Sequence, residues 1–162
     1  MPFRRNCLVF CPYLTDGGHA AVELESLSWT WTRECTFPSD MGTAHNLIEE
    51  VVGKVRSDQW NDKDIFALEL SLEETLMNAV KHGNKSDPSK TVRFECKLNE
   101  DMVYVRVEDE GEGFDPHSLA DPREPDNQTV VSGRGVLLIQ HFATKVEWND
   151  RGNVIEFVKE RS

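Results

Sequence analysis

The chain has 162 residues, a length that suits one domain with a sizeable hydrophobic core. Its formal net charge of −11 comes from 29 acidic and 18 basic residues, which argues against nucleic acid or an anionic membrane as the main partner because both need a basic surface. No apolar run approaches the roughly 20 residues of a membrane span, so we expect a cytoplasmic protein with its four cysteines as free thiols.

The first 27 residues are interpreted as an N-terminal extension, because they show no clear hydrophobic period and contain Pro12 and a Gly17-Gly18 pair. Residues 28–162 are then expected to form one domain. Apolar and polar side chains alternate from Ser28 to Phe37, which is typical of a strand. The following Pro38-Ser39-Asp40 ends this strand and offers side chains that cap a helix.

Two helices are predicted next. The first carries apolar residues at helical spacing from Ala44 to Val55. The second is capped by Asn61-Asp62, has an apolar stripe from Ile65 to Ala79, and ends near Gly83. We expect Gly83 to terminate this helix in the left-handed conformation that glycine adopts easily.

The second half of the chain predicts four strands and a short helix. Alternation at 92–98 and 103–107 indicates an antiparallel hairpin. A long segment at 114–132 contains three prolines and no period, which is typical of a loop that is functional, disordered or both, and it lies where a nucleotide lid would be. A short helix at 136–142 and a closing hairpin at 145–149 and 154–159 complete the order. Helices and hairpins in this order predict an α/β (α+β) two-layer sandwich, with helices on one face of a mixed, mostly antiparallel sheet.

The second helix carries a pair of polar residues suited to metal and proton chemistry. Glu74 and Asn78 are four residues apart, so their side chains share one helix face. The Asn78 amide oxygen is a ligand that Mg²⁺ accepts beside water and substrate phosphates. The Glu74 carboxylate can orient or deprotonate an attacking hydroxyl. For this pair alone, a solvated helix face is the competing interpretation.

Two glycine-containing segments follow in the order that a nucleotide pocket requires. Asp109 leaves a valine-rich strand before Gly111 and Gly113, so its carboxylate can accept a hydrogen bond from an adenine amino group while the glycines let the backbone approach. Gly133-Arg134-Gly135 opens a helix, whose free amides and dipole would hold phosphate oxygens, with a charged contact from Arg134. His82 near the helix end is interpreted as a capping or packing residue.

The three segments together resemble the GHKL (histidine kinase-like) ATPase superfamily. The segment Glu74-x-x-x-Asn78-Ala79-x-x-His82-Gly83 is similar to the N box, Asp109-x-Gly111-x-Gly113-Phe114 to the first glycine box, and Gly133-x-Gly135 to the second. Within the superfamily the chain looks most like the bacterial anti-sigma factor serine/threonine kinases. The resemblance covers about 28–162 and implies the histidine kinase-like (Bergerat) fold. The final hairpin has Gly152-Asn153 where the family often has Gly-Thr.

The resemblance implies a protein kinase that uses ATP and Mg²⁺. It assigns Glu74 as the catalytic base, Asn78 as the metal ligand and Asp109 as the adenine reader. The remaining nucleotide-binding residues implied are His82, Gly111, Gly113, Gly133, Arg134 and Gly135. It also implies a STAS-domain anti-anti-sigma protein as substrate, a sigma factor as second partner, and a homodimer.

Two alternatives remain open at this stage. The first is a non-catalytic module that binds a partner and uses nucleotide only as a conformational switch. The second is the ATPase half of a histidine kinase, which would need a phosphoacceptor helical hairpin ahead of the domain. About 27 residues precede the predicted domain, and these are too few for such a hairpin.

Overall fold

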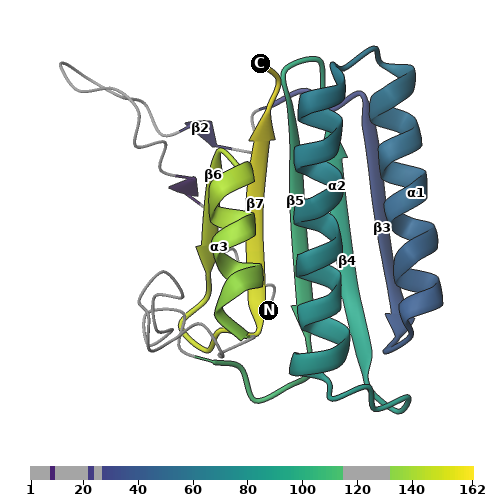
Figure 1. Cartoon of the computed structure of the whole chain (residues 1–162), viewed down its shortest axis with the longest axis vertical. Coiled ribbons are helices and arrows are strands. Elements are labelled where there is room, and N and C mark those ends of the chain that lie inside the picture. The colour runs from purple at the N-terminus through teal and green to yellow at the C-terminus, as the bar shows by residue number, and fades with distance from the viewer. Residues whose placement is uncertain (1–7, 10–21, 24–26, 115–131) are drawn as a thin grey trace, which may run out of the picture.

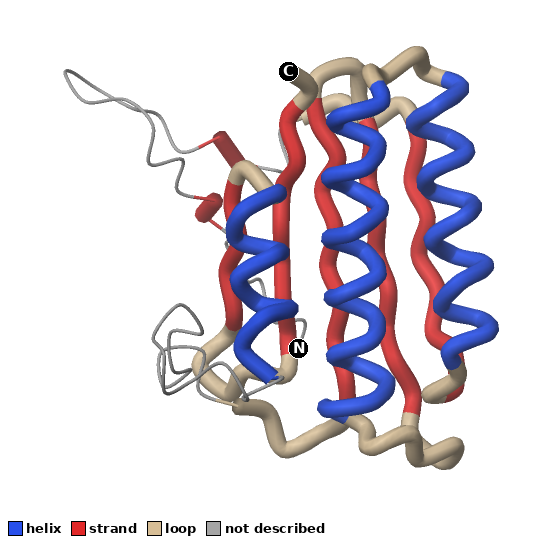
Figure 2. Tube along the Cα trace, viewed as in Figure 1, coloured by secondary structure: helices blue, strands red, loops and turns tan. Residues whose placement is uncertain are grey.

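A computed structural model describes residues 8–9, 22–23, 27–114 and 132–162 of the chain (Figure 1). The main body is a five-stranded sheet with helices packed on one face, while the opposite face carries no helix in the described residues (Figure 2). Its elements are β3 (Trp31–Pro38), α1 (Met41–Ser57), α2 (Asp62–Met77), the π-helix η2 (Asn78–Gly83), β4 (Thr91–Leu98), β5 (Met102–Asp109), α3 (Ser132–Phe142), β6 (Lys145–Trp148) and β7 (Val154–Glu160). The predicted two-layer α+β sandwich is therefore confirmed.

The strand order in the sheet is β3-β4-β5-β7-β6. Every neighbouring pair among these strands is antiparallel, so the sheet is purely antiparallel where a mixed one was expected. The last strand, β7, lies between β5 and β6. This insertion brings the closing hairpin beside the strand that carries Asp109.

Helix capping follows the sequence prediction at both long helices. Asp40 caps α1 by accepting hydrogen bonds from the amides of Gly42 and Thr43. Asn61 caps α2 by accepting one from the amide of Asp64 at 2.9 Å. None of the helices in the described ranges is both long and apolar enough to cross a membrane.

The hydrophobic core lies between the helices and the sheet. The apolar stripes predicted for the two long helices are buried, as are the inward-facing residues of the central strands. Cys96 is buried in this core and Cys35 is half-buried, and both thiols are free. The core residues include Ala44, Leu47, Val51, Val55, Leu68, Leu72, Leu76, Phe94, Val105, Val107 and Phe157.

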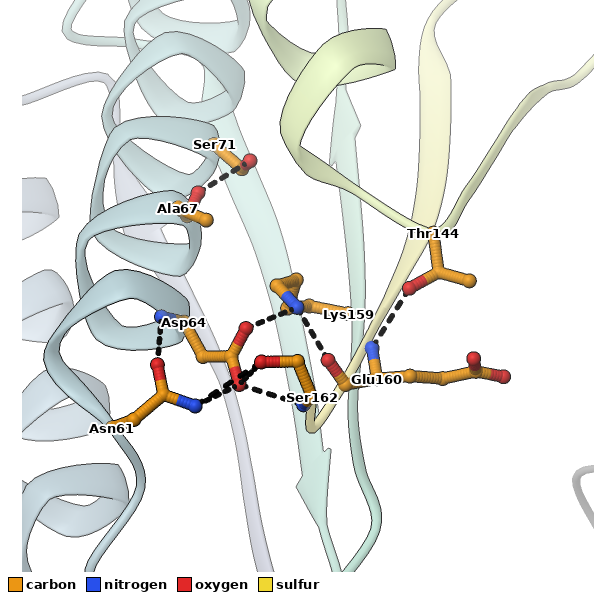
Figure 3. A network of polar contacts seen from close by, with 8 residues as sticks. All are labelled: Asn61, Asp64, Ala67, Ser71, Thr144, Lys159, Glu160 and Ser162. Carbon is orange, nitrogen blue, oxygen red and sulfur yellow. Dashed lines mark hydrogen bonds and ion pairs between the residues drawn. The ribbon is translucent and has the colours of Figure 1, made fainter.

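The first turn of α2 is joined to the last residues of the chain by a buried polar network (Figure 3). Asp64 is only 2% exposed. Its carboxylate pairs with the Lys159 ammonium at 2.7 Å and accepts a hydrogen bond from the Ser162 amide at 2.7 Å. Burial alone would raise the pKa of Asp64, but the hydrogen bonds from Lys159 and Ser162 outweigh it and lower the pKa to about 2.

At the N-terminus, Leu8–Val9 (β1) pairs antiparallel with Val22–Glu23 (β2). The other residues of the predicted extension lie outside the described part of the chain, except Leu27. The predicted lid falls largely on residues 115–131, which also lie outside it.

Candidate functional site

Four parts of the fold converge at one end of the molecule, the lower end in Figure 1. They are the π-helix η2, the end of β5, the start of α3 and the turn between β6 and β7. Residues from all four line a cavity of about 290 Å³. The three sequence segments predicted to form a nucleotide pocket lie on these same elements. The described residues that line the cavity are Thr75, Asn78, Ala79, His82, Gly83, Lys85, Val107, Asp109, Glu112, Gly113, Phe114, Val136, Trp148, Gly152, Asn153 and Ile155.

The second long helix ends in a π-helix rather than in the expected left-handed glycine cap. The amide of Asn84 donates to the carbonyl of Ala79, five residues back, at 2.9 Å. A π-helix has wider turns than an α-helix and often occurs at functional sites. Gly83 is not among the residues with positive φ; Lys85 and Ser86 adopt that conformation instead. The helix thus ends at Gly83 as predicted, but the left-handed conformation predicted for this glycine was wrong, because the chain turns two residues later.

Gly83 is required for a different reason, which is contact with Asp109. A methyl group added at Gly83 would lie 2.5 Å from each oxygen of the Asp109 carboxyl group. A methyl group added at Gly111 would lie 2.7 Å from Asp109 Oδ1. The carboxyl group is thus enclosed by backbone from the helix end on one side and from its own loop on the other.

Within the described part of the chain, only one oxygen of the Asp109 carboxyl group accepts a hydrogen bond. Its Oδ1 accepts a hydrogen bond from the amide of Gly111 at 2.8 Å. Burial raises the pKa of Asp109, and the Gly111 hydrogen bond and the positive charge of Arg151 oppose the increase. A half-buried carboxylate with one committed oxygen suits a single hydrogen bond from an amino group.

Asn84 joins the end of the π-helix to this loop. Its side chain is fully buried. Its Oδ1 accepts a hydrogen bond from the Glu110 amide at 2.8 Å, and its Nδ2 donates to the Ser39 hydroxyl at 2.7 Å and to the Thr91 carbonyl at 2.9 Å. Asn84 therefore sets the position of the backbone directly after Asp109. Sequence reasoning missed it, because an asparagine after a helix-ending glycine looks like an ordinary turn residue.

The loop after Asp109 interlocks with the turn between β6 and β7. Gly113 and Gly152 both have positive φ, at 82° and 74°. A methyl group at either would collide with backbone of the other segment, at Arg151 or Phe114. The Arg151 guanidinium also donates to the Gly111 carbonyl at 2.7 Å. Glycine at both positions allows this backbone contact and conformation together.

Glu74 and Asn78 meet the start of α3 at Gly135. A methyl group at Gly135 would collide with the Glu74 carboxyl group and would lie 3.5 Å from Asn78 Nδ2. Burial raises the pKa of Glu74, the charge of Glu73 raises it further, and His82 opposes the increase. A carboxyl group with a raised pKa is a better proton acceptor, which suits a general base.

The structure brings the predicted site residues together, some in the cavity wall and others directly behind it. Asn78, His82, Asp109 and Gly113 line the cavity. Glu74, Gly111 and Gly135 are not among its described lining residues. Gly111 and Gly135 lie against residues that are, and the Glu74 carbonyl accepts a hydrogen bond from the amide of Asn78, which also lines the cavity. Gly133 and the exposed Arg134 lie in the first turn of α3, where helix amides suit phosphate.

The site offers few described side chains that could coordinate Mg²⁺. The described residues contain no group of three or more His, Cys, Asp or Glu side chains that could hold a metal ion. The Asn78 amide and the Glu74 carboxylate are neighbours at Gly135. Mg²⁺ commonly takes one or two protein oxygens together with water and substrate phosphates, so this donor set fits Mg²⁺ bound with a nucleotide.

Several lining residues were not singled out from the sequence as site residues. Trp148 and Ile155 were interpreted only as members of the closing hairpin, and Thr75 was given no role within the second predicted helix. Asn153 was noted only as a departure from the family pattern. In the structure it is 9% exposed and its Nδ2 donates to the Asp109 carbonyl at 2.8 Å. Finding these residues from the sequence would have required knowledge of which strands pair and in which register.

Comparison with known proteins identifies the class. The sequence pattern of the family described as histidine kinase-like ATPase domain matches residues 37–159, well over half of the chain. The chain belongs to this family. The GHKL resemblance inferred from the three segments is confirmed.

Particular relatives are bacterial regulators. Over 89 residues the chain is 29% identical to an anti-sigma F factor of Clostridium perfringens, and the match covers 52% of the chain and 62% of that protein. Over 124 residues it is 23% identical to the serine-protein kinase RsbW of Oceanobacillus iheyensis, covering 73% of the chain and 77% of that protein. The chain thus spans about three fifths of the length of the anti-sigma F factor.

A solved structure shares the fold. The crystal structure of the RsbU and RsbW domains of a Mycobacterium tuberculosis protein matches with a TM-score of 0.53 and 15% sequence identity. The match covers 82% of this chain and 32% of that one. At this identity the likeness concerns the fold alone.

Proposed function

We propose that residues 28–162 form an ATP-dependent regulatory kinase of the anti-sigma factor type. In this proposal the chain binds ATP with Mg²⁺ and transfers the terminal phosphoryl group to a serine or threonine of a STAS-domain antagonist. It also sequesters a sigma factor, acts as a homodimer and works in the cytoplasm. The single observation that supports it best is that Asp109 and Asn78 line one cavity, with Glu74 beside Asn78 at Gly135, in a chain related to proteins named as an anti-sigma factor and a serine-protein kinase.

Each residue has a defined task in this proposal. ATP supplies the phosphoryl group, and Mg²⁺ offsets negative charge on its phosphates. Asp109 accepts a hydrogen bond from the adenine amino group, and Asn78 offers an oxygen to the metal. Backbone amides at Gly133 and Gly135 and the Arg134 side chain contact phosphate oxygens. His82, at the cavity surface, is a polar neighbour of the phosphates.

Glu74 acts as the general base in the transfer step. The hydroxyl oxygen of the partner's serine or threonine forms a bond to the terminal phosphorus, and the bond from that phosphorus to the bridging oxygen breaks. The hydroxyl proton passes to Glu74. Its raised pKa favours this acceptance, and its contact with Gly135 supports a role beside the turn proposed to bind phosphate.

A second candidate function is a non-catalytic switch that binds nucleotide and a partner. The observation that favours it is the position of Glu74, which is not among the described residues lining the cavity. In this reading nucleotide changes the affinity for the partner and no phosphoryl group moves.

A transfer assay separates the two functions. The chain is incubated with Mg²⁺, ATP labelled at the terminal phosphate, and STAS-domain proteins from the same organism. We expect label on a serine or threonine of one STAS protein, and none when Asn78→Ala replaces the wild type. Tight ATP binding by calorimetry without label on any STAS protein would favour the switch, while absence of ATP binding would contradict both.

A further inference from the structure

Three strands contribute one continuous apolar surface to the cavity. Val107 on β5 pairs in register with Ile155 on β7, and Ile155 pairs with Trp148 on β6. All three residues line the cavity. Residues paired in register share a face of the sheet, so these side chains form a row across neighbouring strands. We call Val107, Ile155 and Trp148 the floor row.

The floor row is flanked by a polar residue on the β5 side and by a second aromatic residue on the β6 side. Asp109 lies two residues after Val107 on the same strand, so it shares that face of the sheet. At the other end, the Trp148 ring meets Phe114 edge to face, with ring centroids 6.5 Å apart. Phe114 is 39% exposed, which is unusual for so large an apolar side chain. The aromatic pair thus borders the open side of the cavity.

Asp109 by itself does not distinguish a purine from a pyrimidine. Its Oδ1 is committed to the Gly111 amide, so it can accept from one amino group on the base. Adenine and cytosine both carry an exocyclic amino group that donates hydrogen bonds. A one-point carboxylate contact therefore accepts either base, and discrimination must come from the surface on which the ring lies.

We propose that Trp148 selects purine over pyrimidine nucleotides by extending the floor row to the length of a two-ring base. This inference rests on the proposed nucleotide function. A base whose amino group contacts Asp109 lies first over Val107 and Ile155. The second ring of a purine continues toward β6 and contacts the Trp148 ring, whereas a single pyrimidine ring ends short of it. Aromatic–base contact is favourable for any base that reaches the ring.

The test compares binding of ATP and CTP, each with Mg²⁺, by calorimetry. Loss of one base–aromatic contact by alanine substitution typically lowers affinity roughly 5- to 150-fold. We expect Trp148→Ala to weaken ATP about tenfold and CTP less than about threefold, so the preference for ATP falls. Trp148→Phe retains an aromatic face and should preserve most of the preference. Trp148→Leu, which keeps apolar volume on the edge strand, provides the same test if the alanine variant does not fold.

Tryptophan fluorescence gives an independent measurement. The chain has four tryptophans. ATP should change the tryptophan emission of the wild type and should not change the emission of Trp148→Phe. Trp31→Phe is the matched control, because Trp31 lies on β3 at the opposite edge of the sheet and does not line the cavity. This control should keep both the response and the ATP affinity.

The outcomes separate this inference from the function on which it rests. If wild type binds neither nucleotide, the proposed function is wrong. If wild type binds ATP, but Trp148→Ala or Trp148→Leu keeps the wild-type ratio of ATP to CTP affinity, the selectivity proposal alone is overturned. An unchanged fluorescence response in Trp148→Phe would likewise overturn it.

Discussion

Gly83 and the carboxyl group of Asp109 are in direct contact, and an added methyl group at Gly83 would lie 2.5 Å from both carboxyl oxygens. The contact joins the end of the π-helix to the end of β5. It leaves no room for a side chain between the residue proposed to read adenine and the helix that carries Asn78. The shape of the cavity therefore depends on a glycine that has ordinary negative φ.

We expect Gly83→Ala to displace the Asp109 carboxyl group and to weaken ATP binding by at least tenfold. A separation of 2.5 Å is well below any normal carbon–oxygen contact, so the backbone or the carboxyl group must shift. The matched control is Gly53→Ala in the middle of α1, where an added methyl group meets nothing within 4 Å. That variant should gain about 0.5–1 kcal/mol of stability and bind ATP as wild type does. Calorimetry and thermal denaturation of both variants provide the measurements, and normal ATP affinity in Gly83→Ala would contradict the contact's importance.

Asp109→Asn should separate ligand binding from stability. The substitution removes the charge and reverses the hydrogen-bond polarity toward an amino group, at a cost of about 1.5–3 kcal/mol in ATP binding. Because burial raises the pKa of Asp109, ionisation opposes folding slightly, and a neutral amide should not lower the melting temperature of the ligand-free protein. Titration calorimetry with ATP and Mg²⁺ checks the first expectation and a thermal scan the second. Equal ATP affinity in mutant and wild type would remove Asp109 from the binding site.

Glu74 and Asn78 should differ in the step that they affect. Asn78→Ala should reduce Mg²⁺-dependent ATP binding and abolish phosphoryl transfer, because it removes the proposed metal ligand. Glu74→Gln should bind ATP nearly as wild type does, while transfer to the STAS protein slows by roughly 10²–10⁴-fold. The lower end of this range is expected, since phosphoryl transfer depends mainly on positioning and charge. Transfer at the wild-type rate by Glu74→Gln would show that Glu74 is not the base.

The Asp64–Lys159 pair predicts a loss of stability in acid. The pKa of Asp64 is about 2 in the folded chain against an ordinary value of 3.8, so folding favours the ionised form. The stabilisation is complete above about pH 4 and is lost as the pH falls toward 2, amounting to about 2–3 kcal/mol. Asp64→Asn should lack this pH dependence and be less stable at neutral pH by about 3–5 kcal/mol, because it leaves the Lys159 ammonium buried without its partner.

Urea unfolding between pH 2 and 7 measures this effect. Asp58→Asn is the control, since it breaks the Lys54–Asp58 pair on the surface of α1 and should cost less than about 1 kcal/mol. The Asp64 network would be unimportant if both variants followed the wild-type curve.

Thr75 should limit the stability of the ligand-free chain. Its hydroxyl is buried and has no hydrogen-bond partner among the described residues. One turn earlier, Ser71 donates to the Ala67 carbonyl at 2.8 Å (Figure 3). Thr75→Val keeps the shape and removes the unpaired hydroxyl, so we expect stability to rise by about 1 kcal/mol. Ser71→Ala should lower it by a similar amount, and chemical denaturation of the two variants should therefore show opposite shifts.

The amino-acid sequence alone determined the secondary structure and the order of the site segments. The stripe from Ile65 to Ala79 and the capping residues Asp40 and Asn61 are local signals, because they depend on the spacing and chemistry of residues within a few turns. The alternation at 92–98 and 103–107 similarly predicted the central hairpin. Asp109 could be placed at a strand end for the same reason.

Only the tertiary structure decided the features that depend on contacts between segments distant in the sequence. The insertion of β7 beside β5 makes the sheet purely antiparallel and sets Ile155 in register with Val107. Gly83 looked like a helix terminator, but its small size is needed by Asp109, 26 positions later in the chain. Asn84 is buried because three separate segments converge on its amide. Periodicity within one segment carries no information about such partners, because packing and register are set by which elements meet and not by the residues nearby in sequence.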